Sequence, residues 1–180
     1  LKRKIRSNFL SKIPCVIMAG GKGTRLKPFT DILPKPLLPI HKQTVIEKII
    51  NSFYSYGIGK FILSVNYKSE ILKAFFRELK PKYSVNFLQE KKPLGTVGSL
   101  SKLTKISAKD IFVSNCDIII DVDLNKMFTF HKENNFDITI LTSAASYQIP
   151  YGICKTSKSG KFQEIHEKPK LEFLTNVGVY

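Results

Sequence analysis

The chain has 180 residues, 43% of them hydrophobic, so it is long enough to fold around a core and too apolar for a disordered chain. Its 29 Lys and Arg residues outnumber 14 Asp and Glu residues, for a net charge of +15. This excess favours anionic partners, such as nucleotides, sugar phosphates, nucleic acids or acidic membrane surfaces, without choosing among them. No apolar run approaches the roughly 18 residues that span a bilayer, so we expect no membrane insertion.

The beginning of the chain predicts a basic arm followed by a buried strand. Residues 1–12 are rich in Lys and Arg and are interpreted as a linker, with one domain over residues 13–180. Residues 13–18 form the short apolar run typical of a buried strand. The three cysteines are widely spaced, without a CxxC or zinc pattern, which predicts free thiols in a cytoplasmic protein.

Helical and strand patterns then alternate along the chain. Apolar spacing and capping signals predict helices at 44–56, 69–79 (capped by Ser69), 96–103 and 124–134. Short apolar runs predict strands at 60–65, 84–88, 110–114, 137–142, 151–155, 161–166 and 176–180. This order predicts an α/β fold, a Rossmann-like three-layer sandwich with a mostly parallel mixed sheet. Ligand groups are then expected at the carboxyl ends of the strands.

A glycine-rich segment directly follows the first predicted strand. Its candidate phosphate-binding residues are Ala19, Gly20, Gly21, Gly23, Thr24 and Arg25. Glycines let backbone N–H groups approach phosphate oxygens, and Arg25 offers a planar fork that suits them. Lys35 follows between two prolines that stiffen its backbone. On these residues alone, an ordinary glycine turn with exposed cations, or a polyproline ligand at residues 36–39, is the alternative. The segment fits neither the Walker A loop nor the dinucleotide fingerprint.

The whole string over residues 18–40 resembles the signature of the sugar-nucleotidyltransferase family. It reads MAGGKGTRLKPFT and then LPKPLLPI, which matches GGxGTRLxPxT…PKPLLP without a gap. The resemblance implies a sugar-1-phosphate nucleotidyltransferase whose glycine loop wraps a nucleoside triphosphate. It implies that Arg25 holds the triphosphate and stabilises its developing charge. Lys35 would contact the α-phosphate and the sugar phosphate.

A second segment resembles the family's base-binding motif. Residues 90–98 read EKKPLGTVG, against ExxPLGTAG in the family. The resemblance implies that Glu90, Gly95 and Thr96 contact the nucleotide, and glycine is the residue that lets the backbone approach a flat base. Without the resemblance, this segment would be interpreted as a helix N-terminus. Val97 replaces the usual alanine, a change that bears on the choice of base.

Asp117 stands where the family has a magnesium-binding aspartate. It follows the strand predicted at 110–114, and Cys116 occupies the place of the family's glycine. A carboxylate at a strand end, facing a triphosphate, suits Mg²⁺. The resemblance therefore implies Mg²⁺ as cofactor and Arg25, Lys35 and Asp117 as catalytic residues. Asp121 and Asp123 are interpreted as helix-capping or surface groups.

Three later segments resemble sugar-contacting motifs of the family, namely YG, EKP and NxG. The implied sugar-phosphate-binding residues are Lys35, Gly152, Glu167, Lys168 and Asn176. Each segment alone fits an ordinary turn or strand. The family usually supplies a second magnesium carboxylate from a later strand, so we expect the catalytic domain to continue beyond residue 180.

Together these features predict transfer of a nucleotide from a nucleoside triphosphate to a sugar 1-phosphate, with release of pyrophosphate. The PLGTxG form is similar to that of guanylyltransferases acting on mannose, heptose or amino-sugar phosphates, so GTP is the favoured nucleotide. The product is expected to serve bacterial cell-surface glycan biosynthesis. The basic linker resembles that of proteins with upstream CBS domains, and a homo-oligomer stays open. The alternatives are thymidylyl or uridylyl transfer to glucose 1-phosphate, and a non-catalytic nucleotide-binding regulatory module. Dispersed cations disfavour nucleic acid as a partner.

Overall fold

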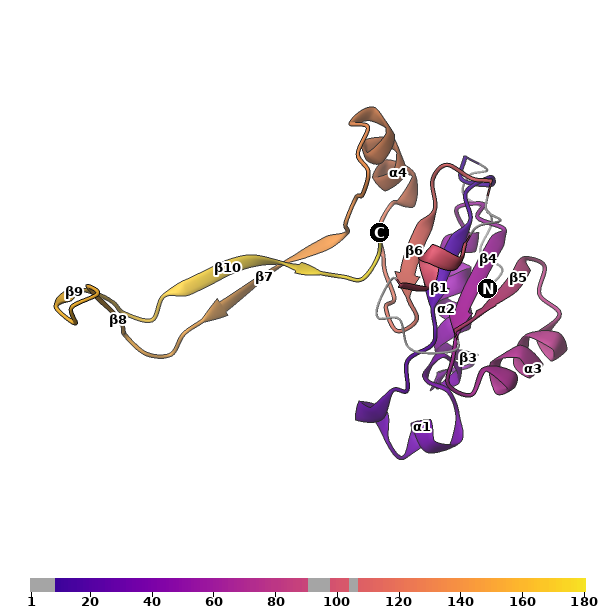
Figure 1. Ribbon diagram of the computed structural model, residues 1–180, viewed down its shortest axis with the longest axis horizontal. Helices are drawn as coiled ribbons and strands as arrows, with labels where there is room; N and C mark the ends of the chain where they lie inside the picture. Colours follow the sequence, from indigo (N-terminus) through magenta and orange to yellow (C-terminus); the bar gives the residue numbers. More distant parts are fainter. Residues whose placement is uncertain (1–8, 91–97, 104–106) are drawn as a thin grey trace. The chain divides into compact units, whose positions relative to one another are not determined.

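The computed structural model describes residues 9–90, 98–103 and 107–180 (Figure 1). The chain divides into two compact units, one made of Leu1–Thr139 with Gly178–Tyr180 and the other of Ile140–Val177. Within the described ranges, no helix combines the length and the apolarity needed to cross a membrane.

A parallel sheet forms the centre of the first unit. Its strands are β1 (Cys15–Met18), β4 (Lys60–Val65), β5 (Ser84–Gln89) and β6 (Phe112–Asn115). Their order is β5-β4-β1-β6, and every pair is parallel. β1 and β4 are almost entirely buried, as their apolar runs predicted. The sheet continues beyond β6 with the end of the chain, which runs antiparallel to it.

This antiparallel return makes the sheet mixed. Val113 and Tyr180 exchange two backbone hydrogen bonds of 2.8 Å, and Ser114 bridges Val179. The predicted α/β fold with a mostly parallel mixed sheet is therefore confirmed. The strand predicted at 176–180 is wrong in its extent, because Asn176 ends β10 and the residues after it form a single bridge at Val179.

Three α-helices cover one face of this sheet. They are α2 (Val45–Tyr54), α3 (Ser69–Leu79) and α4 (Leu124–Glu133). The ring of Phe112 on β6 meets Phe53 of α2 at 5.8 Å and Phe128 of α4 at 6.3 Å between centroids. Phe76 of α3 meets Phe87 of β5 at 6.1 Å. The strand register places Phe87 and Phe112 on the same face, so all three helices pack there.

The opposite face carries a smaller core. Val16, Ile62 and Val113 are buried together, and Leu100 and Leu103 pack against them. Leu100 belongs to the 3₁₀ helix η3 (Gly98–Lys102). The helix predicted at 96–103 is therefore a 3₁₀ turn where the structure describes it, and its first two residues lie outside the described ranges.

Local capping explains where the helices begin. Thr44 and Glu47 form a reciprocal capping box at α2, with bonds of 2.8 and 3.3 Å. Asp123 caps α4 by accepting from the backbone N–H of Asn125 at 3.0 Å, as predicted. The predicted cap at Ser69 is wrong, because the N-cap of α3 is Lys68 in a left-handed conformation, without a side-chain cap.

The packed structure of the first unit already includes residues before 13. Leu10, which lies in the expected linker, is fully buried, and Phe9 meets Phe128 with ring centroids 5.9 Å apart. The boundary expected at residue 12 stays a prediction. Phe9 and Leu10, on its N-terminal side, both pack within the first unit.

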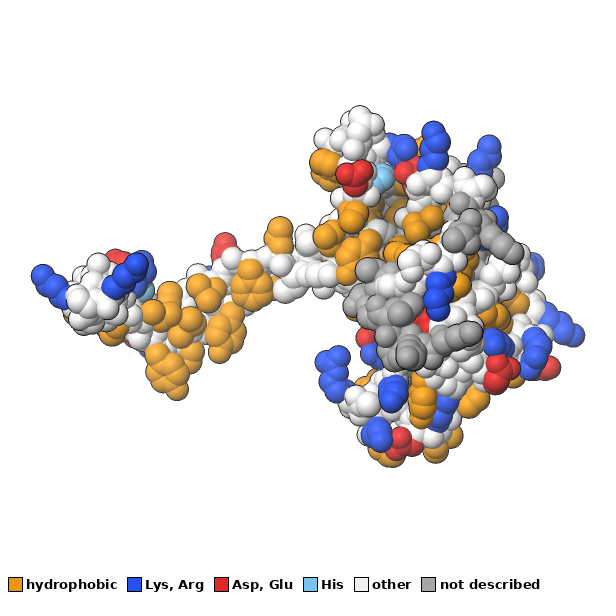
Figure 2. Space-filling view, in the orientation of Figure 1, with side chains coloured by type: hydrophobic (Ala, Val, Ile, Leu, Met, Phe, Trp, Pro, Cys, Tyr) orange, Lys and Arg blue, Asp and Glu red, His pale blue; other side chains and the backbone are white. Residues whose placement is uncertain are grey.

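The second unit is built of antiparallel strand pairs. β7 (Thr142–Gln148) pairs with β10 (Lys170–Asn176), and β8 (Ile153–Thr156) with β9 (Phe162–His166). The strand predicted at 137–142 is wrong, because pairing begins only where Thr142 meets Asn176, and a distant partner leaves no local signal. Many hydrophobic side chains of this unit are exposed (orange in Figure 2).

Candidate functional site

The glycine-rich segment begins at the carboxyl end of the central strand β1. The N–H of Ala19 donates to the carbonyl of Ser64 on β4 at 2.8 Å, which attaches the start of the loop to the sheet. Gly23 has a φ of +65°, and a Cβ there would lie 2.9 Å from Cγ2 of Thr30 and 3.2 Å from Cβ of Lys35. Both the backbone conformation and the space therefore require glycine at this position. The close approach also brings the loop against Lys35.

Two residues that the sequence analysis left without a role close this loop. Thr30 is buried, and its hydroxyl donates to the carbonyl of Gly23 at 3.0 Å. Lys68 donates to the carbonyl of Thr30 at 3.3 Å and also to that of Asp31. The only sequence signal for Thr30 was its place at the end of the signature string, and nothing local pointed to Lys68.

Lys35 and Asp117 meet although 82 positions separate them in sequence. Lys35 begins the 3₁₀ helix η2 (Lys35–Leu37), and Asp117 lies two residues beyond β6. The ammonium of Lys35 donates to Oδ2 of Asp117, forming an ion pair. Their side chains are 23% and 37% exposed, so solvent and a ligand can reach the pair. Arg25 is exposed within the nearby turn η1 (Thr24–Leu26).

Cys116 is buried beside this pair. Burial, with a smaller contribution from the negative charge of Asp117, raises the pKa of the thiol to about 12, although Lys35 opposes the shift. A thiol with so high a pKa stays neutral at physiological pH and is a poor nucleophile. Cys116 is therefore not expected to act as a nucleophile.

Glu90 is the one expected base-binding residue that the structure describes, since Gly95 and Thr96 lie outside the described ranges. It directly follows β5 and is 6% exposed. The hydroxyl of Ser64 donates to its Oε1. A Cβ on Gly20 would lie 3.6 Å from that same oxygen, so Glu90 contacts the glycine loop. Gly20 and Glu90 follow the carboxyl ends of β1 and β5, on either side of β4 in the sheet.

Two of the expected sugar-contacting residues come together in the second unit. A Cβ on Gly152 would lie 2.8 Å from Oε2 of Glu167, so the YG and EKP motifs are in contact. Lys168 has a φ of +44°, and its carbonyl accepts from Nε2 of Gln148 at 3.5 Å.

Asn176 is separated from this group. It pairs with Thr142 at one end of β10, whereas Lys170, two residues after Lys168, begins the same strand. Six steps of about 3.3 Å place Asn176 about 20 Å from that beginning. Within the second unit, Asn176 therefore does not join Gly152 and Glu167.

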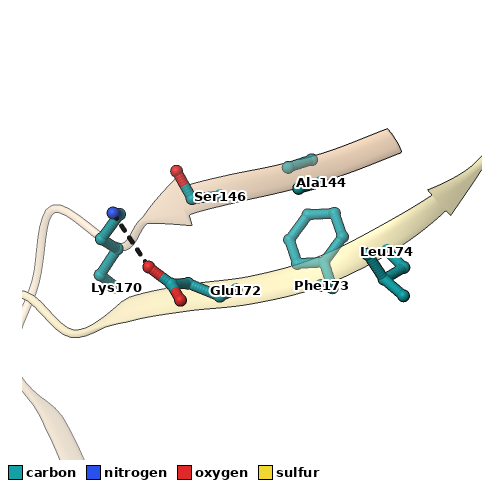
Figure 3. Close-up of a pocket in the computed structure, with 7 residues that line it drawn as sticks. Ala144, Ser146, Lys170, Glu172, Phe173 and Leu174 are labelled. Atoms are coloured by element: carbon teal, nitrogen blue, oxygen red, sulfur yellow. Dashed lines mark ion pairs between the residues drawn. The ribbon is translucent and has the colours of Figure 1, made fainter. Parts of the chain in front are cut away.

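A shallow hollow on the strands β7 and β10 holds none of the expected residues (Figure 3). It is lined by Ala144, Ala145, Ser146, Lys170, Glu172, Phe173 and Leu174. Lys170 and Glu172 form an exposed ion pair of 3.0 Å across its end. Because its walls come from only two strands, the hollow offers a ligand contacts on one side alone.

Asp117 is the one residue of the site that the sequence predicts as a metal ligand. Among the described residues, no group of three or more His, Cys, Asp or Glu side chains gathers to hold a metal ion. Asp117 is a partly exposed carboxylate, paired with Lys35, which packs against Gly23 of the glycine loop. Magnesium is commonly held by one or two carboxylates together with waters and substrate phosphates, and Asp117 fits that mode.

The arrangement has a counterpart among solved structures. HddC from Yersinia pseudotuberculosis, determined in complex with GMP-PN, superposes with a TM-score of 0.65 at 26% sequence identity, covering 93% of this chain and 75% of that one. The similarity supports a Rossmann-like nucleotide-diphospho-sugar transferase fold. The class that the fold defines is thus that of the nucleotide-diphospho-sugar transferases.

Residues 15–180 match the family model for nucleotidyl transferases, and the chain belongs to this family. It is 35% identical to the mannose-1-phosphate guanyltransferase of Yarrowia lipolytica over 174 residues, which are 92% of this chain and 48% of that protein. It is 32% identical to mannose-1-phosphate guanylyltransferase 1 of Arabidopsis thaliana, with the same coverage of 92% and 48%. The chain thus spans about half the length of these curated relatives. The family resemblance of the sequence is confirmed.

Proposed function

We propose that the protein to which this chain belongs transfers a guanylyl group from GTP to a sugar 1-phosphate, yielding a GDP-sugar and pyrophosphate. The observation that carries this proposal is the contact between Lys35 and Asp117 beside the glycine loop. It joins two segments of the signature at the carboxyl ends of parallel strands, where α/β folds bind ligands. The curated relatives, named as mannose-1-phosphate guanyltransferases, support GTP and mannose 1-phosphate as the first substrates to test.

The residues of the chain would act by positioning and by offsetting charge. A sugar phosphate oxygen attacks the α-phosphorus of GTP, the bond to the β-phosphate oxygen breaks, and pyrophosphate leaves. This displacement needs no enzyme nucleophile, in keeping with the neutral thiol of Cys116. Arg25 and Lys35 would hold phosphate oxygens through charge-assisted hydrogen bonds. Glu90 and the glycine loop would hold the nucleotide.

Asp117 is the residue we propose to hold Mg²⁺. When bound, the metal would neutralise charge on the phosphates. Asp117 keeps Lys35 beside the glycine loop in the free protein. Gly152, Glu167 and Lys168 are proposed to contact the sugar phosphate, whereas a contact from Asn176, at the far end of β10, stays a prediction from the resemblance alone. We further propose that the reaction runs in the cytoplasm and supplies cell-surface glycan synthesis in a bacterium. Upstream CBS domains and a homo-oligomer remain predictions.

A substrate panel on the full-length protein tests the proposal. Pyrophosphate release is measured with GTP, ATP, UTP and dTTP, each with mannose, glucose and glucosamine 1-phosphates. We expect GTP with mannose 1-phosphate to give the highest kcat/KM, and EDTA to stop the reaction. Preference for dTTP or UTP with glucose 1-phosphate would select the alternative transferase. Nucleotide binding without release of pyrophosphate in any combination would select a regulatory module.

A further inference from the structure

Ser64 on β4 is bonded to two nucleotide-binding segments at once. Its carbonyl accepts from the N–H of Ala19, where the glycine loop begins, at 2.8 Å. Its hydroxyl donates to Oε1 of Glu90, where the base segment begins. β4 lies between β1 and β5 in the sheet, so one serine links the strands that lead into both segments.

Burial makes this hydroxyl important to its partner. Ser64 is fully buried and Glu90 is 6% exposed, so water contributes little to either side chain. A polar side chain withdrawn from water needs hydrogen bonds to replace those it loses to the solvent. The bond from Ser64 therefore holds the Glu90 side chain in one orientation.

The surroundings hold the carboxylate against the glycine loop. A Cβ added at Gly20 would lie 3.6 Å from Oε1 of Glu90 and 3.4 Å from Cβ of Asn66. The side-chain amide of Asn66 donates to the backbone carbonyl of Glu90 at 3.0 Å. The main chain of Glu90 is thus fixed by Asn66, and its side chain by Ser64.

We propose that Ser64 is a positioning residue of the nucleotide site, which fixes the carboxylate of Glu90 where it accepts hydrogen bonds from the bound nucleotide. This inference rests on the proposed function, because it takes a nucleoside triphosphate as the ligand. Ser64 itself touches no ligand and acts through Glu90. It lies inside an apolar strand pattern, where its role has no sequence signal.

Calorimetric titration with GTP tests the proposal on four proteins: the wild type, Ser64→Ala, Glu90→Gln and the double variant. We expect Ser64→Ala to raise the Kd for GTP about tenfold, the factor that one charge-assisted hydrogen bond supports. In the Glu90→Gln background the same substitution should change the Kd by about twofold or less, because coupled residues are not additive. In turnover, the change should appear in KM for the nucleotide and not in kcat.

The matched control is Ser55→Ala. Ser55 is also a buried serine, 3% exposed, and it is the C-cap residue of α2. Its hydroxyl donates to the carbonyl of Ser52, in the last turn of that helix, at 2.7 Å. We expect this variant to bind GTP as the wild type does, which separates the loss of a buried hydroxyl from the loss of this particular one. Thermal unfolding of all variants verifies that they are folded.

Two results would overturn the proposal. One is a Kd of Ser64→Ala close to that of the wild type, and the other is a full multiplication of the two single effects in the double variant. Failure of the wild type to bind any nucleoside triphosphate would instead overturn the proposed function, and it is seen before any variant is made. If the wild type prefers UTP or dTTP, the same titrations with that nucleotide decide the role of Ser64.

Discussion

At the scale of single residues, the pairing of Lys35 with Asp117 places opposite charges together before any substrate is bound. Both side chains are partly exposed, and exposed ion pairs contribute little to stability, about 1 kcal/mol or less. The pair is therefore better explained by the ligand it would receive than by the stability it gives. Incoming phosphates and a cation would each find a partner of opposite charge.

Arg25 provides the first test at this scale. Replacing Arg25 by alanine is expected to lower kcat/KM for pyrophosphate release about 10²- to 10³-fold, because under the proposed function it removes a charge that holds the triphosphate. Lys27→Ala is the matched control, since Lys27 is a 60% exposed cation two residues further on, paired with Asp31 at 3.3 Å. Near-normal turnover of the Arg25 variant in a coupled pyrophosphate assay would remove Arg25 from the proposed site.

The thiols provide a second test. Burial and the charge of Asp117 raise the pKa of Cys116 to about 12, so below that pH the neutral thiol predominates and the reactive thiolate is scarce. We expect iodoacetamide at pH 8 to alkylate the exposed Cys154 well before Cys116, as followed by peptide mass spectrometry. In urea, where burial is lost, both should react alike. Equal labelling rates in the folded protein would contradict the buried, neutral state of Cys116.

At the scale of elements, the glycine loop is a short piece of backbone held by its neighbours on several sides. The turn at Gly23 is closed by Thr30, and Thr30 is in turn held by Lys68 from the start of α3. The loop is thus set by a chain of hydrogen bonds that ends in the helical layer. Its shape is consequently formed in the free protein.

Gly23→Ala tests this construction. The change places a Cβ 2.9 Å from Thr30 in a left-handed backbone, and we expect it to lower the free energy of unfolding by about 1–3 kcal/mol. Gly59→Ala is the control, because a Cβ there meets nothing within 4 Å. Urea unfolding monitored by circular dichroism compares the two. Equal unfolding free energies would show that the loop relaxes around the added methyl group.

Elements with local signals were predictable, and those set by distant partners were not. The helix after Thr44 follows from its apolar spacing and its capping box, and the buried strands β1 and β4 from their apolar runs. The start of β7 depends on its pairing with β10. The local sequence of β7 contains no signal of where that pairing begins. The short η3 stands where a helix was predicted, and its Leu100 packs against the small core of Val16, Ile62 and Val113.

The candidate site was predictable mainly through family resemblance. Spacing alone gave a phosphate loop after a strand, but the contact of Lys35 with Asp117 depends on the order of strands in the sheet. Ser64 was missed because it lies within an apolar run. Lys68 was missed because its role depends on its left-handed backbone and on a long side chain that contacts residues distant in the sequence. Such contacts follow from tertiary structure, which no local window contains.

At the scale of the whole molecule, the two units differ in how much core they hold. The first surrounds a four-stranded sheet with helices, whereas the second consists of two-stranded pairs with exposed apolar side chains. Two-stranded ribbons are marginally stable by themselves in water. Stability is therefore expected to be distributed unevenly along the chain.

Hydrogen–deuterium exchange on the 180-residue chain measures this difference. We expect backbone amides of β7 and β10 to exchange at least about tenfold faster than those of β1 and β4, because they open with less loss of buried apolar surface. Peptide-resolved mass spectrometry reports both groups in one experiment, with α2 as an internal reference for the first unit. Equal protection in the two units would show that the ribbon has a cooperative core of its own.

Because the end of the chain returns to the edge of β6, the second unit can differ in length or sequence without altering the first. The second unit begins at Ile140 and ends at Val177, and the amide of Val177 donates to the carbonyl of Leu141 at 3.1 Å. The first and last residues of the second unit therefore lie side by side. The unit can be described as an insertion into the first unit whose two ends are adjacent. Closing such a gap with a short turn costs little chain entropy. Natural or engineered variants can thus lengthen, shorten or exchange this unit while the parallel sheet and the glycine-rich segment keep their sequence and connectivity.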